Sequence, residues 1–310
     1  MTPLVIAPCT RRKRLEVPPL LQGRNLPVGD SRFVSEAWVA RVRASSPLLR
    51  AVAFYGGRSL AEARATAEAI SAHLCFVSAG LGIIDQNEKI PAYSLTTAPG
   101  DADSISGKIQ GSFTAQTWWI DLHRALGMPG GRLSNLLSHS NGTVLLALPS
   151  TYLALIDSEL STLPAPLLAR IRIIGPPKNK VPANLIPMWM PYDARLDTLD
   201  PSRSGTRSDF PQRAARHFAE VVLNDEPYAD AAKHASLVTN ILTPFRPKTT
   251  ESGRSATDAE LIKIIRDLLP GLNYRSTVTL RHLRRELRIA CEQSRFRRLF
   301  EIARRGDCKP

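Results

Sequence analysis

The chain has 310 residues, of which 43% are hydrophobic, so it can build a sizeable core and has the length of two domains. Its formal net charge is +13, and a surface this basic attracts polyanions such as nucleic acids. No apolar run approaches the roughly 18 residues of a membrane span. The charges near the start follow a very short apolar run, the reverse of a secretory signal, so we expect a cytoplasmic protein.

Cysteine and histidine spacing gives no sign of a metal or disulfide framework. The four cysteines (Cys9, Cys75, Cys291 and Cys308) lie far apart without a C-x-x-C pair, and the six histidines form no H-E-x-x-H motif. A lone Gly80-x-Gly82, without a third glycine or a P-loop elsewhere, argues against NAD and ATP. We therefore expect no cofactor and no metal, while a ligand set assembled from distant segments stays open.

Buried apolar runs alternate with helical patterns over residues 1–245. Strands are predicted over residues 4–7, 74–78, 144–148 and 171–174, with a short extended piece over 51–55. Helices are predicted over residues 32–46, 60–73 (capped by Ser59), 117–126, 150–160 and 212–224, and a long polar loop over 97–117. Strands separated by helices imply parallel pairing and an α/β domain.

A linker over residues 246–255 precedes a basic module over residues 256–310. Residues 246–310 hold 16 Lys and Arg against 8 Asp and Glu. A capping box from Ser255 to Asp258 opens the first helix, and two more helices, over 279–289 and 294–305, flank a short turn. This spacing predicts a helix-turn-helix or winged-helix domain that binds DNA. Its expected contacts are Arg281, Arg284, Arg285, Arg295, Arg297 and Arg298.

The most informative segment is residues 76–93, an apolar run that breaks into a turn at Gly80 and Gly82 and then reaches Asp85, Asn87, Glu88 and Tyr93. We interpret it as a buried strand that delivers polar groups to the end of a sheet, where α/β proteins place their chemistry. Asp85 or Glu88 would activate water, and Asn87 and Tyr93 would bind a base. The glycines would let a ligand approach the backbone. The alternatives are an Asp/Asn turn that ends a strand and a tyrosine that covers the sheet edge.

Basic residues follow two of the predicted strands. Arg11, Arg12, Lys13 and Arg14 come after the first, and Lys178 and Lys180 after the fourth. Clustered cations at a strand end suit a nucleic-acid backbone, and a solvated charge run is the alternative. Cys9 has no neighbouring histidine or second cysteine to activate it as a nucleophile.

Two motifs carry a family resemblance: strand-Pro-Cys-Thr-x-x-Lys at residues 4–13, and residues 77–84 leading to Glu88, Pro91 and Tyr93. Over about residues 1–180 the chain resembles the uracil-DNA-glycosylase-like domain of archaeosine-synthesis enzymes and of related bacterial proteins in mobile and defence loci. The resemblance implies a three-layer sandwich around a four-stranded parallel sheet, with a nucleobase pocket at the carboxyl ends of the strands. The expected base-binding residues are Cys9, Thr10, Ser78, Gly80, Gly82, Asn87, Tyr93 and Ser150.

With its basic helical module, the chain resembles anti-phage DNA glycosylases of the Brig type. The Gly-Gln-Asp-Pro-Tyr motif of uracil excisers is absent, so the expected substrate is a modified base in double-stranded phage DNA. The expected reaction is base flipping and hydrolysis of the N-glycosidic bond, leaving an abasic site. No lysine is clearly positioned for a Schiff base. A non-catalytic nucleic-acid or nucleotide sensor is the alternative, and the oligomeric state is open.

Overall fold

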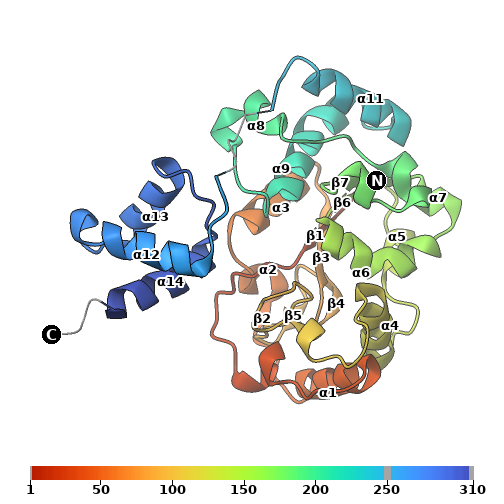
Figure 1. Ribbon diagram of the computed structural model, residues 1–310. Helices are drawn as coiled ribbons and strands as arrows, with labels where there is room; N and C mark the ends of the chain where they lie inside the picture. Colours follow the sequence, from red (N-terminus) through yellow and green to blue (C-terminus); the bar gives the residue numbers. More distant parts are fainter. Residues whose placement is uncertain (1, 248–252, 307–310) are drawn as a thin grey trace. The chain divides into compact units, whose positions relative to one another are not determined.

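The computed structural model describes residues 2–247 and 253–306. The chain forms two compact units, Met1–Pro247 and Lys248–Pro310 (Figure 1). The division lies inside the predicted linker, residues 246–255, of which residues 248–252 lie outside the described part. Across the described residues, no helix is both long enough and apolar enough to cross a membrane.

A five-stranded sheet in the order β4-β3-β1-β6-β7 forms the centre of the first unit. Its parallel strands are β1 (Leu4–Pro8), β3 (His73–Ser78), β6 (Val144–Ala147) and β7 (Ile171–Ile174). These are the four predicted strands, so the α/β class and the parallel pairing are confirmed. The fifth strand, β4 (Gly82–Asp85), was not predicted and runs antiparallel to β3 at the edge.

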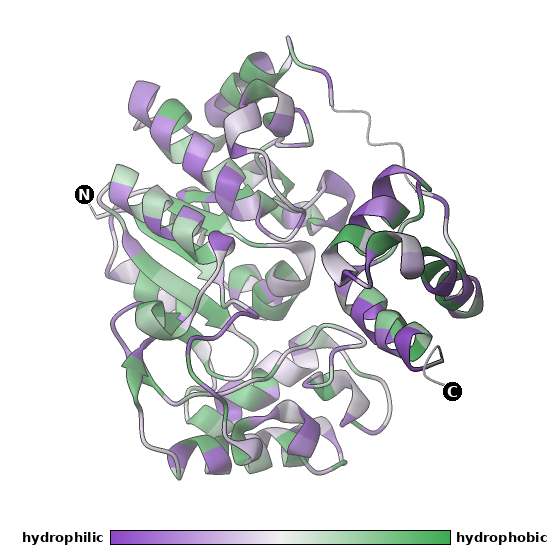
Figure 2. Ribbon diagram, turned by 90° about the vertical axis from the view of Figure 1, so that its left-hand side faces the viewer, coloured by the Kyte–Doolittle hydropathy of each residue, from purple (hydrophilic) through white to green (hydrophobic). Residues whose placement is uncertain are grey.

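Helices lie on both sides of this sheet (Figure 1), which explains why its central strands are apolar on both faces (Figure 2). On one side, α3 (Arg58–Ala69) packs against α9 (Phe210–His217), and both contact strands of the sheet. On the other, α4 (Ala115–Leu126) packs between α1 (Ser31–Arg43) and α6 (Ser150–Ser161). The sheet and its two helical sides form three layers.

Side-chain caps explain several helix starts, and two predictions fail. Asp30 caps α1 and Thr114 caps α4, each side chain accepting from a backbone N–H of the first turn. Ser59 does not cap α3, which begins at Arg58 after a glycine. Residues 51–54 form the short helix α2 (Ala51–Phe54), so the predicted extended piece is wrong.

The remaining elements of the first unit are short. The strands β2 (Leu49–Arg50) and β5 (Lys89–Ile90) pair antiparallel beside the main sheet. The predicted helix 212–224 is α9, a π turn (Phe218–Val222) and α10 (Leu223–Asp225). The unpredicted helices are α5 (Leu133–Ser138), α7 (Ala165–Leu168), α8 (Leu196–Leu199) and α11 (Ala231–Leu242). Single 3-10 turns are η1 (Pro19–Leu21), η2 (Gly23–Asn25), η3 (Ile105–Gly107), η4 (Lys178–Lys180), η5 (Ala183–Met188) and η6 (Pro201–Arg203).

Over residues 253–306, the second unit has three α-helices around a core of its own. They are α12 (Asp258–Leu268), α13 (Ser276–Arg285) and α14 (Gln293–Gly306), with the turn η8 (Pro270–Leu272). The capping box forms between Thr257 and Glu260, so the predicted box from Ser255 to Asp258 is wrong by two residues. Residues 286–292 connect α13 to α14, a longer connection than predicted, and Ile289 within it bridges to Arg254.

Candidate functional site

The carboxyl ends of β1 and β3 lie side by side and bring Cys9 and Ser78 to the same end of the sheet. The Cys9 N–H donates to the Val77 carbonyl oxygen at 2.8 Å, and the Cys9 sulfur lies 3.4 Å from the Tyr152 hydroxyl of α6. The side chains of Cys9 and Ser78 are buried. The predicted base-binding residues Cys9 and Ser78 therefore lie side by side at this end of the sheet, and ligands of parallel α/β sheets commonly bind at that end.

A chain of hydroxyl groups continues from Ser78. The Tyr93 hydroxyl lies 2.5 Å from Ser78 Oγ and 2.6 Å from the Tyr55 hydroxyl. Burial raises the pKa of both tyrosine phenols, which keeps them neutral. Tyr93 is fully buried, so the prediction that its ring stacks on a base is wrong; the ring packs against Trp38 and Phe54 instead.

Lys13 points into this cluster, although its three arginine neighbours are exposed. Its Nζ lies 4.5 Å from the ring centre of Tyr55, 4.9 Å from that of Tyr93 and 5.3 Å from that of Phe54. Among the described residues, no carboxylate forms an ion pair with Lys13. Burial lowers the pKa of Lys13, and the nearby Cys9 opposes this shift to a smaller extent. Lys13 is therefore not the exposed phosphate contact that the basic run predicts.

The loop after β1 is folded by hydrogen bonds that set this inward direction. Thr10 Oγ1 donates to the Arg12 carbonyl oxygen at 2.9 Å and accepts from the Gly56 N–H at 3.1 Å. Lys13 itself forms an isolated antiparallel bridge with Tyr55. Thr10 thus has a positioning role in the loop, and its backbone contacts hold Lys13 over the aromatic rings.

Gly80 and Gly82 are needed for protein packing, which corrects the expectation that they make room for a ligand. A Cβ at Gly80 would lie 3.0 Å from the Trp38 ring, and the Trp38 indole N–H donates to the Gly80 carbonyl oxygen at 2.6 Å. Gly82 has φ +76°, and its Cβ would lie 2.8 Å from Nε2 of the buried His123. Both glycines shape the turn that reverses the chain from β3 into β4.

We expect Gly82→Ala to lower the free energy of unfolding by about 2–5 kcal/mol. The left-handed backbone costs alanine about 1–2 kcal/mol, and crowding against His123 adds about 1–3 kcal/mol. Gly127→Ala is the matched control, because Gly127 has φ +83° but no atom within 4 Å of its Cβ position. Urea unfolding measures both variants. Equal losses would show that His123 moves aside without cost.

The predicted catalytic carboxylates lie away from this cluster. In β4 the chain turns back along β3, so Asp85 pairs with Cys75 while Gly82 pairs with Ser78. Three residues of a strand span about 10 Å, so Asp85 lies about 10 Å from Gly82, away from the carboxyl end of β3. Because side chains alternate along β3, those of Cys75 and its partner Asp85 point to the opposite face from Ser78. The expectation that Asp85 extends beyond a strand end is therefore wrong.

Asn87 and Glu88 lie beside Asp85 and, like it, away from the strand-end cluster. The Asn87 N–H donates to Asp85 Oδ1 at 2.6 Å in a tight turn, and the Asn87 side chain is exposed. Glu88 forms an ion pair with Arg132 at 3.0 Å. This is the Asp/Asn turn that the sequence left open as the alternative, and it does not join the base-binding candidates at the strand ends.

Exposed cations surround the strand-end cluster. Arg11, Arg12 and Arg14 are exposed, and Arg11 forms an ion pair with Asp101 at 3.0 Å. Lys178 and Lys180 are exposed just after β7, and Ser150 begins α6 after β6. Parallel strands bring all of these residues to the same end of the sheet. Asp101, from the long polar loop, is the described carboxylate that forms an ion pair with the loop after β1.

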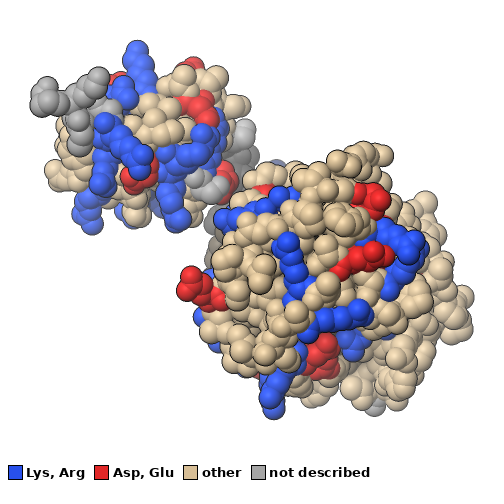
Figure 3. Space-filling model, turned by 90° about the horizontal axis from the view of Figure 1, so that it is seen from below, with Lys and Arg blue, Asp and Glu red and all other residues tan. Residues whose placement is uncertain are grey.

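The predicted DNA contacts of the second unit divide into two groups. Arg295 and Arg298 form ion pairs with Asp258 at 2.7 and 2.6 Å, and Arg284 donates to the Cys291 carbonyl oxygen. Arg281, Arg285 and Arg297 are exposed and form no ion pair within the described residues. Basic side chains cover much of the face of this unit that Figure 3 shows. The second group is thus available to a phosphate backbone.

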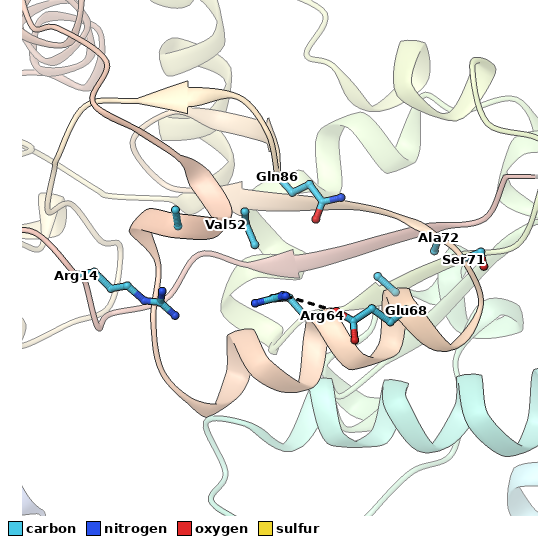
Figure 4. A pocket seen from close by; sticks show the side chains of 9 residues that line it. Arg14, Val52, Arg64, Glu68, Ser71, Ala72 and Gln86 are labelled. Atoms are coloured by element: carbon cyan, nitrogen blue, oxygen red, sulfur yellow. Dashed lines mark ion pairs between the residues drawn. The ribbon is translucent and has the colours of Figure 1, made fainter.

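A separate hollow of about 570 Å³ lies beside α2 and α3. Arg14, Arg64, Glu68 and Gln86 line it together with smaller residues, and Arg64 pairs with Glu68 at 3.5 Å (Figure 4). None of the base-binding candidates among the described residues lines this hollow. We therefore do not assign the base to it.

The sequence predicts Lys13 as one of four exposed cations after the first strand and gives it no separate role, although Lys13 is the lysine of the Pro-Cys-Thr-x-x-Lys motif. What distinguishes Lys13 from its arginine neighbours is its contact with Phe54 and Tyr55, which only the folded structure brings near it.

Comparison of the chain with known protein families, curated proteins and solved structures finds no match.

Proposed function

We propose that this chain is a DNA N-glycosylase that removes a modified base at the carboxyl ends of β1 and β3. The observation that carries the proposal is the inward Lys13, held against three aromatic rings near Cys9 in a loop whose arginines are exposed. A flipped nucleobase would meet the Lys13 amine at the end of the sheet where α/β proteins bind ligands.

Lys13 provides the proton that the departing base needs. When the bond between the sugar C1′ and the base nitrogen breaks, the base keeps the electron pair and becomes negatively charged. Lys13 Nζ–H donates a proton to it, and the lowered pKa of Lys13 improves such a donor near neutral pH. Water adds to C1′ and releases a proton, which leaves an abasic site.

Asp101 is the carboxylate that we assign to the water. Its ion pair with Arg11 holds it at the loop that carries Lys13. A carboxylate there stabilises the positive charge that develops on the sugar and accepts the proton of the water. Asp85 and Glu88, which the sequence favours, lie too far back along the sheet for this role.

The exposed cations complete the proposal. Arg11, Arg12 and Arg14 would hold the phosphates on either side of the flipped nucleotide, with Lys178 and Lys180 after β7. The second unit would add affinity for the duplex through Arg281, Arg285 and Arg297. A role in defence against phage with modified DNA follows from the resemblance alone.

The test is base release from duplexes that differ in a single base. The full-length protein is incubated with unmodified DNA and with DNA containing uracil, 5-hydroxymethylcytosine or a glucosylated base. Free base is measured by mass spectrometry, and abasic sites by alkaline cleavage. We expect release from at least one modified duplex and none from unmodified DNA. Binding of a free base or nucleotide without any release would replace the enzyme by a sensor.

A further inference from the structure

We propose that His73, Cys75 and Asp85 bind one zinc ion at the β3–β4 edge of the sheet. A ring nitrogen of His73, the Cys75 Sγ and a carboxylate oxygen of Asp85 all lie within 4.8 Å of one another. This group lies apart from the strand-end site, and the proposal does not depend on the glycosylase function.

The fold holds the three side chains in place through strand geometry. His73 and Cys75 are two residues apart on β3, so they point to the same face of the sheet. Asp85 stands directly opposite Cys75 in the antiparallel pair with β4. Gly82, which the turn requires, fixes the register of this hairpin. The site is therefore built on paired strands and not on a loop.

The donor atoms select zinc over harder ions. Thiolate, imidazole and carboxylate are the ligands of zinc, whereas magnesium and calcium take oxygen donors. The side chains of His73 and Asp85 are 37% and 30% exposed, so an ion can enter from solvent and water can fill the fourth position. His73 Nε2 and a carboxylate oxygen of Asp85 are in direct contact.

The surrounding charges balance a divalent cation. Asp85, Glu88 and a Cys75 thiolate give three negative charges, and Arg132 gives one positive charge. Arg132 is already bound to Glu88 and to the Ile83 carbonyl oxygen, each at 3.0 Å. Cysteine binds zinc as the thiolate.

The test titrates zinc chloride into the metal-free, full-length protein by calorimetry. We expect one equivalent of zinc to bind. Cys75→Ser and Asp85→Asn should each weaken binding by at least about 100-fold, and Cys291→Ser, at a buried cysteine of the second unit, should leave it within about threefold.

Cobalt(II) gives a second readout. The cobalt-loaded protein should show a sulfur-to-cobalt charge-transfer band that Cys75→Ser removes and Cys291→Ser keeps. Asp85→Asn preserves shape at a partly exposed position, so it reports on the site even where Cys75→Ser disturbs the core. Absence of binding, or unchanged zinc affinity in both ligand variants, would leave only a His73–Asp85 ion pair and overturn the proposal.

Discussion

Replacing Lys13 by methionine is expected to lower the rate of base release by about two to three orders of magnitude on a responsive duplex. The change removes the proton donor for the departing base, an effect of the size seen for general acids. Methionine keeps the length of the side chain and its contacts with the rings of Tyr55 and Tyr93, so the fold should persist. Single-turnover rates with enzyme in excess measure the chemical step.

Matched variants test whether Lys13 acts as a proton donor or only through its positive charge. Lys89→Met removes an exposed lysine on β5 and should leave the rate within about twofold. Lys13→Arg keeps the charge but cannot donate a proton readily, so it should be nearly as slow as the methionine variant. An arginine variant with the normal rate would reduce Lys13 to an electrostatic role. A covalent DNA adduct trapped by borohydride would show that Lys13 is a nucleophile instead.

Two carboxylate variants test the placement of the catalytic water. Asp101→Asn is expected to lower base release by about two orders of magnitude, because Asp101 stands at the loop of Lys13. Glu88→Gln should leave the rate within about threefold, since Glu88 lies with Asp85 toward the other end of the sheet. The same duplex assay measures both. The reverse result would restore the carboxylates that the sequence favours and would remove Asp101 from the mechanism.

The sequence predicts the parallel strands well because each is a short apolar run that helices must cover on both faces. It predicts the turn at Gly80 and Gly82 but not the strand β4 that follows it. The close contacts of these glycines with Trp38 and His123 depend on helices distant in sequence. Because β4 pairs back along β3, Asp85 lies away from the strand end where the sequence placed it.

The sequence also does not predict contacts between side chains that only the tertiary structure brings together. Lys13 meets the rings of Tyr55 and Tyr93 through a loop held by Thr10, and nothing in the local run of cations distinguishes it from its neighbours. Cys75 and Asp85 are ten positions apart and become partners only through the register of β3 and β4. The C-x-x-C and H-E-x-x-H spacings therefore do not detect the ligand set that we propose.

Removing residues 248–310 is expected to weaken binding to duplex DNA by at least tenfold at physiological salt and to flatten its salt dependence. These residues hold 15 Lys and Arg against 8 Asp and Glu. Each lost phosphate contact should reduce the slope of log K against log salt by about 0.9. The first unit has its own core and should stay folded. Fluorescence anisotropy at several salt concentrations measures affinity and slope together.

A triple variant of the full chain tests which arginines of the second unit account for the salt dependence of DNA binding. Arg281→Gln, Arg285→Gln and Arg297→Gln together should reduce the slope by about 2.7, because these arginines have no ion-pair partner within the described residues. The matched control, R32Q/R64Q/K89Q, removes the same charge from the first unit away from the strand ends and should change the slope by less than about 1. Equal effects of the two triples would mean that total charge, and not the helical unit, sets the affinity for DNA.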